Sequence, residues 1–172
     1  MARIQQQRII LGIDPGLAHT GWGVVSQQGA RLSCVAYGCI ETPSSWSLPD
    51  RLGKIYGQIA AVVNRYKPEC VSIETVWFGS NTTTAFATGQ ARGAALAACA
   101  GSVASFAEYS PKQIKLAIVG TGAAEKEQVE YMVQHLLQLE SKPQPDHAAD
   151  ALAAAICFAS FDVASFERLA SL

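Results

Sequence analysis

The segment RIILGID (residues 8–14) decides how this chain folds. It is apolar and rich in β-branched residues, and Pro15-Gly16 follows it directly, a pattern typical of a buried strand that ends in a turn. Its last residue, Asp14, places a charge at the end of this apolar run. Burying a lone carboxylate is costly unless a cation or a hydrogen-bond donor compensates it. Asp14 is therefore the first candidate for a functional residue.

The segments on either side of this strand predict the rest of the fold. TGWGVVS (20–26) and RLSCVAYGCIE (31–41) follow after short turns, so the first three strands are expected to form an antiparallel meander. Residues 47–68 place apolar side chains on one face of an amphipathic helix. We further expect strands at 69–74 and 102–110, and helices at 81–100, 111–119, 124–139 and 146–160. This order predicts an α/β protein with a mixed five-stranded sheet and helices on both faces, in one domain (1–160) followed by a loosely ordered tail (161–172).

The composition narrows the class of protein. The chain has 172 residues, of which 49% are hydrophobic and 16% charged, as expected for one globular domain. Its formal net charge of −1 provides no overall attraction to nucleic acid, so any such binding needs a local basic patch. The 5 cysteines form no CxxC pair, which argues against a zinc site, and their odd number suits a reducing cytoplasm. Apolar runs are shorter than the roughly 20 residues of a membrane span, so we expect no membrane attachment.

The segment PDHAADALAAAI (145–156) predicts an apolar helix whose first turn carries three polar side chains. Asp146 follows Pro145, and aspartate is favoured at a helix N-cap, so we expect Asp146 to cap this helix. His147 and Asp150 are three residues apart and therefore share one face of the helix.

Together with Asp14 and Glu74, which end two predicted strands, these two side chains suggest a metal site. Strand ends and a neighbouring helix start can converge in a mixed sheet, and converging carboxylates repel one another unless a cation neutralises them. Carboxylate oxygens with one imidazole suit Mg²⁺ or Mn²⁺. Taken singly, an aspartate or glutamate at a strand end is more often a turn former or a solvated side chain. The prediction therefore depends on the convergence of all four residues.

Five segments resemble, in this order, the signature blocks of the RuvC family of bacterial Holliday-junction resolvases. They are ILGIDPGLAHTGWGVV, VSIETVW, TGQARG, VGTGAAEKEQV and PDHAADALAAA, and the resemblance extends over about residues 8–158. It implies an RNase H-like fold and a homodimer that uses Mg²⁺ to nick two strands of a four-way DNA junction symmetrically, in homologous recombination and DNA repair. It also implies the RuvA–RuvB branch-migration complex as a partner.

The resemblance implies roles for individual residues. Asp14, Glu74 and Asp150 match the three carboxylate ligands of the family, and His147 occupies a position that holds Asp in some members and His in others. These four catalytic residues would hold two Mg²⁺ ions per subunit, with Mn²⁺ as a possible substitute. Two ions so placed would activate water and stabilise the leaving 3′ oxygen, so that the product carries a 5′ phosphate.

Five further residues are candidates for DNA binding. Trp77 matches a family aromatic that stacks on unpaired bases, and Asn81 matches a polar loop residue beyond it. Lys115 and Lys126 fall where the family has lysines near the scissile phosphate, and Lys112 lies beside them in sequence. From the residues alone, Trp77 could equally anchor its loop to the core, and Lys126 could belong to a solvated helix face among glutamates.

The helix expected at 81–100 is rich in small residues, including Gly89, Gly93, Ala94, Ala97 and Ala98. The resemblance implies that this helix pairs the two subunits, whereas close packing on the sheet of the same chain would use the same residues.

Three other functions are alternatives. An actin-like or sugar-kinase ATPase would need a second domain with a second phosphate loop, for which the chain has neither length nor repeat. A non-catalytic junction-binding module would be expected to lack some of the four ligands. An RNase H-like nuclease acting on RNA is excluded only by the resemblance.

Overall fold

The computed structural model describes residues 7–75 and 82–170, and the side chains of 162–170 lie outside that description. The strands are β1 (Arg8–Asp14), β2 (His19–Gln28), β3 (Arg31–Glu41), β4 (Cys70–Glu74) and β5 (Ser105–Tyr109). The helices are α1 (Leu48–Tyr66), α2 (Thr82–Cys99), α3 (Pro111–Val119), α4 (Lys126–Leu136) and α5 (Asp146–Ala170).

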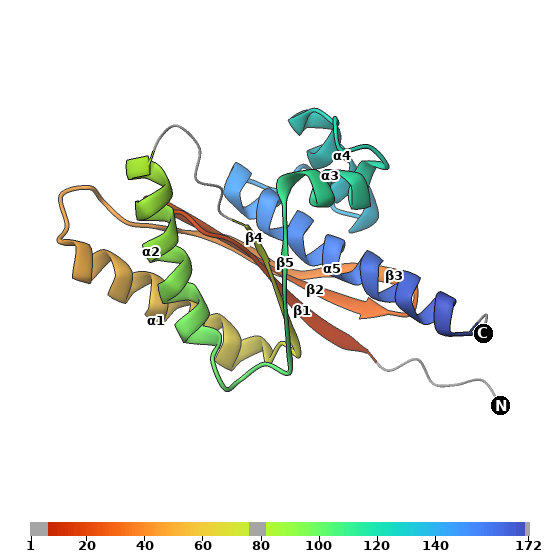
Figure 1. Ribbon diagram of the computed structural model, residues 1–172, viewed down its shortest axis with the longest axis horizontal. Helices are drawn as coiled ribbons and strands as arrows, with labels where there is room; N and C mark the ends of the chain where they lie inside the picture. Colours follow the sequence, from red (N-terminus) through yellow and green to blue (C-terminus); the bar gives the residue numbers. More distant parts are fainter. Residues whose placement is uncertain (1–6, 76–81, 171–172) are drawn as a thin grey trace.

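The strands form one mixed five-stranded sheet in the order β3-β2-β1-β4-β5, which confirms the predicted architecture. β1 lies at the centre, antiparallel to β2 and parallel to β4. Helices α1 and α2 pack on one face of the sheet, and α5, with α3 and α4 against it, covers the other (Figure 1).

The side chains of β1 alternate between these two helical layers. Leu11 and Ile13 are fully buried in the core shared with α1 and α2, whereas Ile10 belongs to the core beneath α5. Gly12 also faces α5, because its α-carbon lies directly under that helix. Since side chains alternate along a strand, Asp14 emerges on the α5 face at the end of β1.

Helix α5 lies unusually close to the sheet because glycines line the strands beneath it. A β-carbon added to Gly12 would lie 1.9 Å from the carbonyl oxygen of Ala151, and one added to Gly21 would lie 1.8 Å from that of His147. The buried Ser72 hydroxyl also donates a hydrogen bond of 2.6 Å to the carbonyl of Ala154. These backbone contacts fix both the height of α5 above the sheet and its position along its own axis.

Helix α5 is longer than expected. We expected the last helix to end at residue 160, but α5 continues through Ala170. The loosely ordered tail expected at 161–172 stays a prediction. Residues 161–170 contain neither glycine nor proline, so no residue in that segment interrupts the helix. Despite this length, none of the described helices combines the extent and apolar character that crossing a bilayer requires.

The seating of α5 predicts a large loss of stability in Gly12→Ala. The new methyl group would overlap backbone atoms that cannot rotate away, so we expect the free energy of unfolding to fall by at least about 2 kcal/mol. Gly57→Ala is the matched control, because Gly57 lies within α1 with open space around its α-carbon. That control should be neutral or gain up to about 1 kcal/mol. Urea unfolding followed by circular dichroism measures both, and equal stabilities would contradict the predicted overlap.

Candidate metal centre

Two adjacent parallel strands bring two of the four candidate ligands to one edge of the sheet. β1 and β4 pair in parallel up to Ile13 and Ile73, and the next residues are Asp14 and Glu74. Glu74 lies two residues beyond Ser72, whose side chain faces α5, so strand alternation directs Glu74 to the same face as Asp14.

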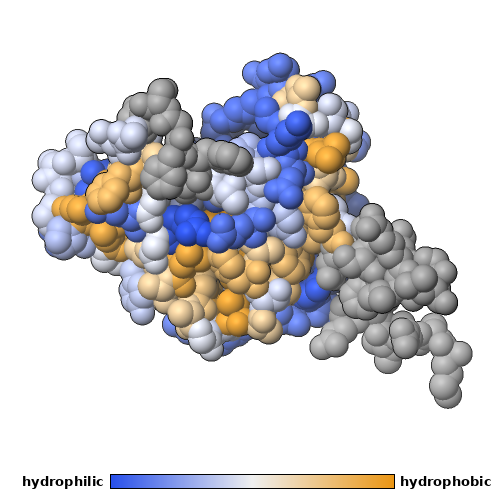
Figure 2. Space-filling view, viewed as in Figure 1, coloured by the Kyte–Doolittle hydropathy of each residue, from blue (hydrophilic) through white to orange (hydrophobic). Residues whose placement is uncertain are grey.

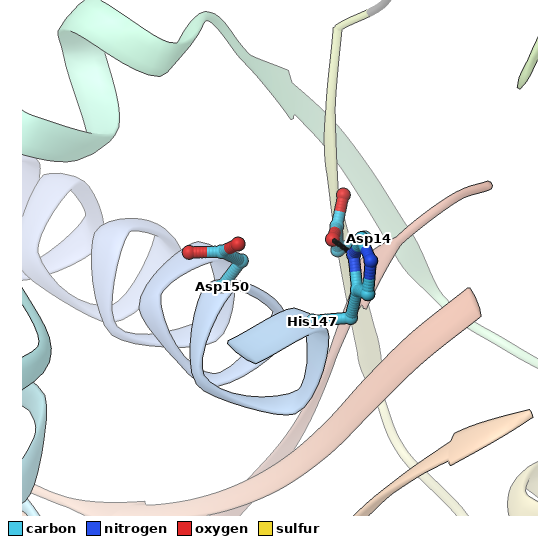
Figure 3. A group of neighbouring side chains, drawn as sticks. All are labelled: Asp14, His147 and Asp150. Carbon is cyan, nitrogen blue, oxygen red and sulfur yellow. Dashed lines mark hydrogen bonds and ion pairs between the residues drawn. The ribbon is translucent and has the colours of Figure 1, made fainter. Parts of the chain in front are cut away.

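The first turn of α5 supplies the other two candidates. The oxygen and nitrogen atoms that Asp14, His147 and Asp150 could offer to a metal lie within 4.8 Å of one another. His147 Nδ1 lies 2.7 Å from Asp14 Oδ2. Figure 3 shows the His147 ring directed at Asp14, with Asp150 further along the same helix. Glu74 is not in this group of three, but it lies close enough for the charges of Asp14 and Asp150 to act on it.

Two carboxyl groups of this cluster, those of Glu74 and Asp150, are held where their ionised forms are unfavourable. Burial, followed by the charges of Asp14 and Asp150, raises the pKa of Glu74 to about 7. Burial, followed by the charge of Asp14, raises the pKa of Asp150 to about 6. The ammonium groups of Lys115 and Lys126 oppose these shifts at Glu74 and Asp150, respectively. Excess negative charge and oxygen ligands beside one imidazole fit a hard divalent cation such as Mg²⁺ or Mn²⁺.

Lys126 lies at the edge of this cluster rather than among neighbouring glutamates alone. Its Nζ lies 2.9 Å from Asp146 Oδ2 and 3.8 Å from Asp150 Oδ2. The hydrogen bond from Lys126 is the main cause that lowers the pKa of Asp146. Lys115 acts on Glu74 from α3. Both lysines therefore bring positive charge to the site.

All five DNA-binding candidates stay predictions. Trp77 and Asn81 lie outside the described residues. Lys112 stands in the first turn of α3, and its aliphatic carbons pack over the α-carbon of Gly122.

The expected role of Asp146 as N-cap needs correction. The carbonyl of Pro145 accepts hydrogen bonds from the amides of Ala148, at 2.8 Å, and Ala149, at 3.4 Å, so Pro145 holds the capping position. Asp146 is the first residue inside α5, and its carboxylate accepts from Lys126. Its charge still lies at the helix N-terminus, where it is favourable.

One residue that the sequence analysis did not single out lies directly beside the cluster. The ring of His19 stacks on that of His147, with centroids 5.4 Å apart and planes 7° from parallel. Its spacing from Gly21 and Gly23 places His19 on their face of β2, but nothing in that local spacing points to the contact with His147.

A mixed sheet with acidic residues at the ends of its two central parallel strands and at the start of the last helix defines an RNase H-like nuclease fold. A model of the family described as "Crossover junction endodeoxyribonuclease RuvC" matches residues 10–158. The chain belongs to the RuvC family.

Relatives and solved structures agree with this assignment. Crossover junction endodeoxyribonuclease RuvC of Rubrobacter xylanophilus is 48% identical over 155 residues, 90% of this chain and 87% of that protein. The RuvC of Heliobacterium modesticaldum is 50% identical over 151 residues, 88% and 93% of the two chains. The structure of T. thermophilus RuvC in complex with a Holliday junction substrate superposes with a TM-score of 0.87 at 35% identity, covering 92% of this chain and 96% of that one.

The raised pKa values predict how the stability of the metal-free protein depends on pH. Glu74 and Asp150 keep their protons to a higher pH in the folded chain than in the unfolded chain. The folded state therefore binds more protons between about pH 4 and pH 7, and stability falls as the pH rises through that interval. Glu74→Gln removes one ionising group, so its loss of stability between about pH 5 and pH 8 should be smaller by about 1–2 kcal/mol.

Urea unfolding in the presence of a chelator provides this comparison. Glu127→Gln, which removes an exposed carboxylate of α4 outside the cluster, is the control and should follow the wild-type pH dependence. If Glu74→Gln had the same pH dependence as wild type, burial and neighbouring charge would not be acting on Glu74.

Proposed function

We propose that this protein is a metal-dependent endonuclease that resolves four-way (Holliday) DNA junctions by symmetric paired nicking, in homologous recombination and DNA repair. The observation that carries the proposal is the convergence of Asp14, Glu74, His147 and Asp150 at one edge of the sheet. Membership of the RuvC family supports the junction as substrate, since its relatives are named crossover junction endodeoxyribonucleases.

Each residue of the cluster would contribute a ligand to the divalent metal ions. Asp14 is closest to His147 and links the sheet to α5, while Glu74 and Asp150 add carboxylates on either side. Divalent ions bound there, two Mg²⁺ per subunit or Mn²⁺ in their place, would activate the attacking water and stabilise the leaving 3′ oxygen, yielding 5′-phosphate and 3′-hydroxyl ends.

The DNA would approach over α3 and α4. Hydrophilic side chains gather over these two helices (Figure 2). Lys115 and Lys126 stand between this surface and the carboxylates, where they would meet the scissile phosphate, and Lys112 adds charge nearby. We assign Trp77 to stacking on unpaired bases at the crossover and Asn81 to a polar contact with DNA, following the family resemblance.

A homodimer would supply the two sites that paired nicking needs. On α2, Phe86, Gly89, Gly93 and Ala97 are exposed and recur at helical spacing. Ala98 instead packs into the core of its own chain. This exposed face of α2 consists of small residues and one phenylalanine, so we assign it to the contact with a second subunit. Family membership also supports the RuvA–RuvB complex as partner and the cytoplasm as location.

The decisive experiment supplies Mg²⁺ with a four-way junction, a linear duplex or an RNA–DNA hybrid. Preferential cutting of the junction, with nicks at symmetric positions, supports the proposal. Cleavage of the hybrid alone would identify an RNase H-like enzyme acting on RNA, and binding without cutting would identify a non-catalytic junction-binding module.

Asp14→Asn, Glu74→Gln and Asp150→Asn should each reduce junction cleavage by well over about a hundredfold, because each removes a ligand carboxylate. Junction binding should survive, since each change also removes negative charge that faces phosphate. Single-turnover cleavage and gel-shift assays separate the two effects. A variant that cuts near the wild-type rate would remove its residue from the site.

His147→Asp should keep activity and shift the metal preference from Mn²⁺ toward Mg²⁺. An imidazole is a softer ligand than a carboxylate, so its replacement favours the harder ion. The ratio of Mn²⁺-supported to Mg²⁺-supported cleavage should therefore fall relative to wild type. An unchanged ratio would show that His147 does not bind the metal.

Phe86→Glu should convert the dimer to a monomer, because it introduces a charge into the proposed contact, where Phe86 is 66% exposed in the single chain. Tyr131→Glu, on an aromatic of α4 that is 54% exposed, is the matched control and should stay dimeric. Sedimentation velocity distinguishes the two, and monomeric wild type with full paired nicking would exclude α2 as the subunit contact.

A further inference from the structure

We propose that His19 is a positioning residue of the metal centre, whose imidazole ring holds that of His147 in the orientation needed to bind the ion. The inference rests on the proposed function only in taking the cluster to be a metal site. The observation behind it is a contact between the rings of His19 on β2 and His147 on α5.

The fold places His19 beside the cluster for reasons visible in the strand register. Asp14 pairs with Gly21 across the antiparallel β1–β2 ladder. His19, two residues before Gly21, therefore projects from the same face of β2, the face that α5 covers. Because Gly21 has no side chain, the carbonyl of His147 lies directly above it. The first turn of α5 thus sits next to the start of β2, where the two imidazoles meet.

Without the ring of His19 beside it, the imidazole ring of His147 could adopt many orientations. Its side chain is 44% exposed, and the terminal torsion of a histidine has broad minima that permit the ring to turn. The contact of Nδ1 with Asp14 fixes one atom of the ring. The parallel stack, with planes 7° apart, restricts rotation of the ring about that contact. Together they keep the imidazole directed at the carboxylates before a cation arrives.

His19 acts through His147 rather than as a ligand. Among the described residues, the group whose donor atoms could reach one ion contains Asp14, His147 and Asp150. Removal of a group that orients a metal-binding histidine weakens metal affinity. We therefore expect about threefold to tenfold weaker Mn²⁺ binding when the stack is lost.

The chain has 3 histidines, which permits a direct test in solution. Ring signals of protein labelled at histidine are recorded by NMR without metal and assigned with single variants. Mn²⁺ affinity is measured by electron paramagnetic resonance without DNA. The variants are His19→Ala, which removes the stack, and His19→Phe, which keeps an aromatic ring. His135→Ala is the control, because that ring stacks on Tyr131 of α4 instead.

In His19→Ala the ring signals of His147 should move, since the neighbouring ring current is gone, and Mn²⁺ affinity should fall about threefold to tenfold. His19→Phe should restore affinity, and His135→Ala should leave the His147 signals and the affinity unchanged. Unchanged His147 signals or unchanged affinity in His19→Ala would overturn the proposal. So would a phenylalanine variant as weak as the alanine one, because the stack would then not be what matters. None of these readouts uses DNA, so they stand apart from the cleavage assays that decide the proposed function.

Discussion

The close seating of α5 on β1 and β2 is the contact on which the rest of the site depends. Gly12 and Gly21 let backbone carbonyls of the helix approach where any β-carbon would collide with them. Small side chains of α5 at Ala148, Ala151 and Ala154 are buried at this contact and its continuation. A helix held by its backbone cannot slide or lift as one held by long, flexible side chains can. The first turn of α5 is therefore placed accurately enough for His147 to meet Asp14.

The same packing creates the repulsion between the carboxyl groups of the site. Apolar contacts hold the ends of β1 and β4 against the start of α5. The carboxyl groups at these positions are therefore kept close together although they repel one another. Glu74 and Asp150 consequently favour their protonated forms more than ordinary carboxylic acids do. A cation that binds only the folded chain would relieve this repulsion and stabilise the fold at the same time. Metal affinity and folding stability are thus coupled through the same side chains.

The elements and the residues that converge at the candidate site were predictable because both follow local rules. Strand alternation and helical spacing depend only on nearby residues. RIILGID could therefore be predicted as a strand, and the alanine-rich segment of α5 as a helix, from the sequence. The N-cap of α5 was placed one residue too late, at Asp146 instead of Pro145. The reason is that the cap depends on which carbonyl accepts the first helical hydrogen bond. The role of Lys126 was ambiguous because its partner, Asp146, lies 20 residues away. The stack of His19 on His147 joins segments further apart still, and no local spacing reveals such a pair.

The lysines at the edge show how positive charge can be kept near the carboxylates without taking the place of the ion. Lys126 lies 2.9 Å from Asp146 but 3.8 Å from Asp150, so its direct hydrogen bond goes to the outer carboxylate. Asp146 is exposed and belongs to the helix start rather than to the ligand group. By holding the ammonium group there, Asp146 leaves the oxygens of Asp150 available to a cation while Lys126 still moderates the repulsion felt by Asp150. An ammonium at this distance faces solvent on its other side, where an incoming phosphate would find it. The first turn of α5 thereby separates two tasks in the proposed site, where His147 and Asp150 lie beside Asp14 and would bind the ion, while Asp146 holds the ammonium group of Lys126.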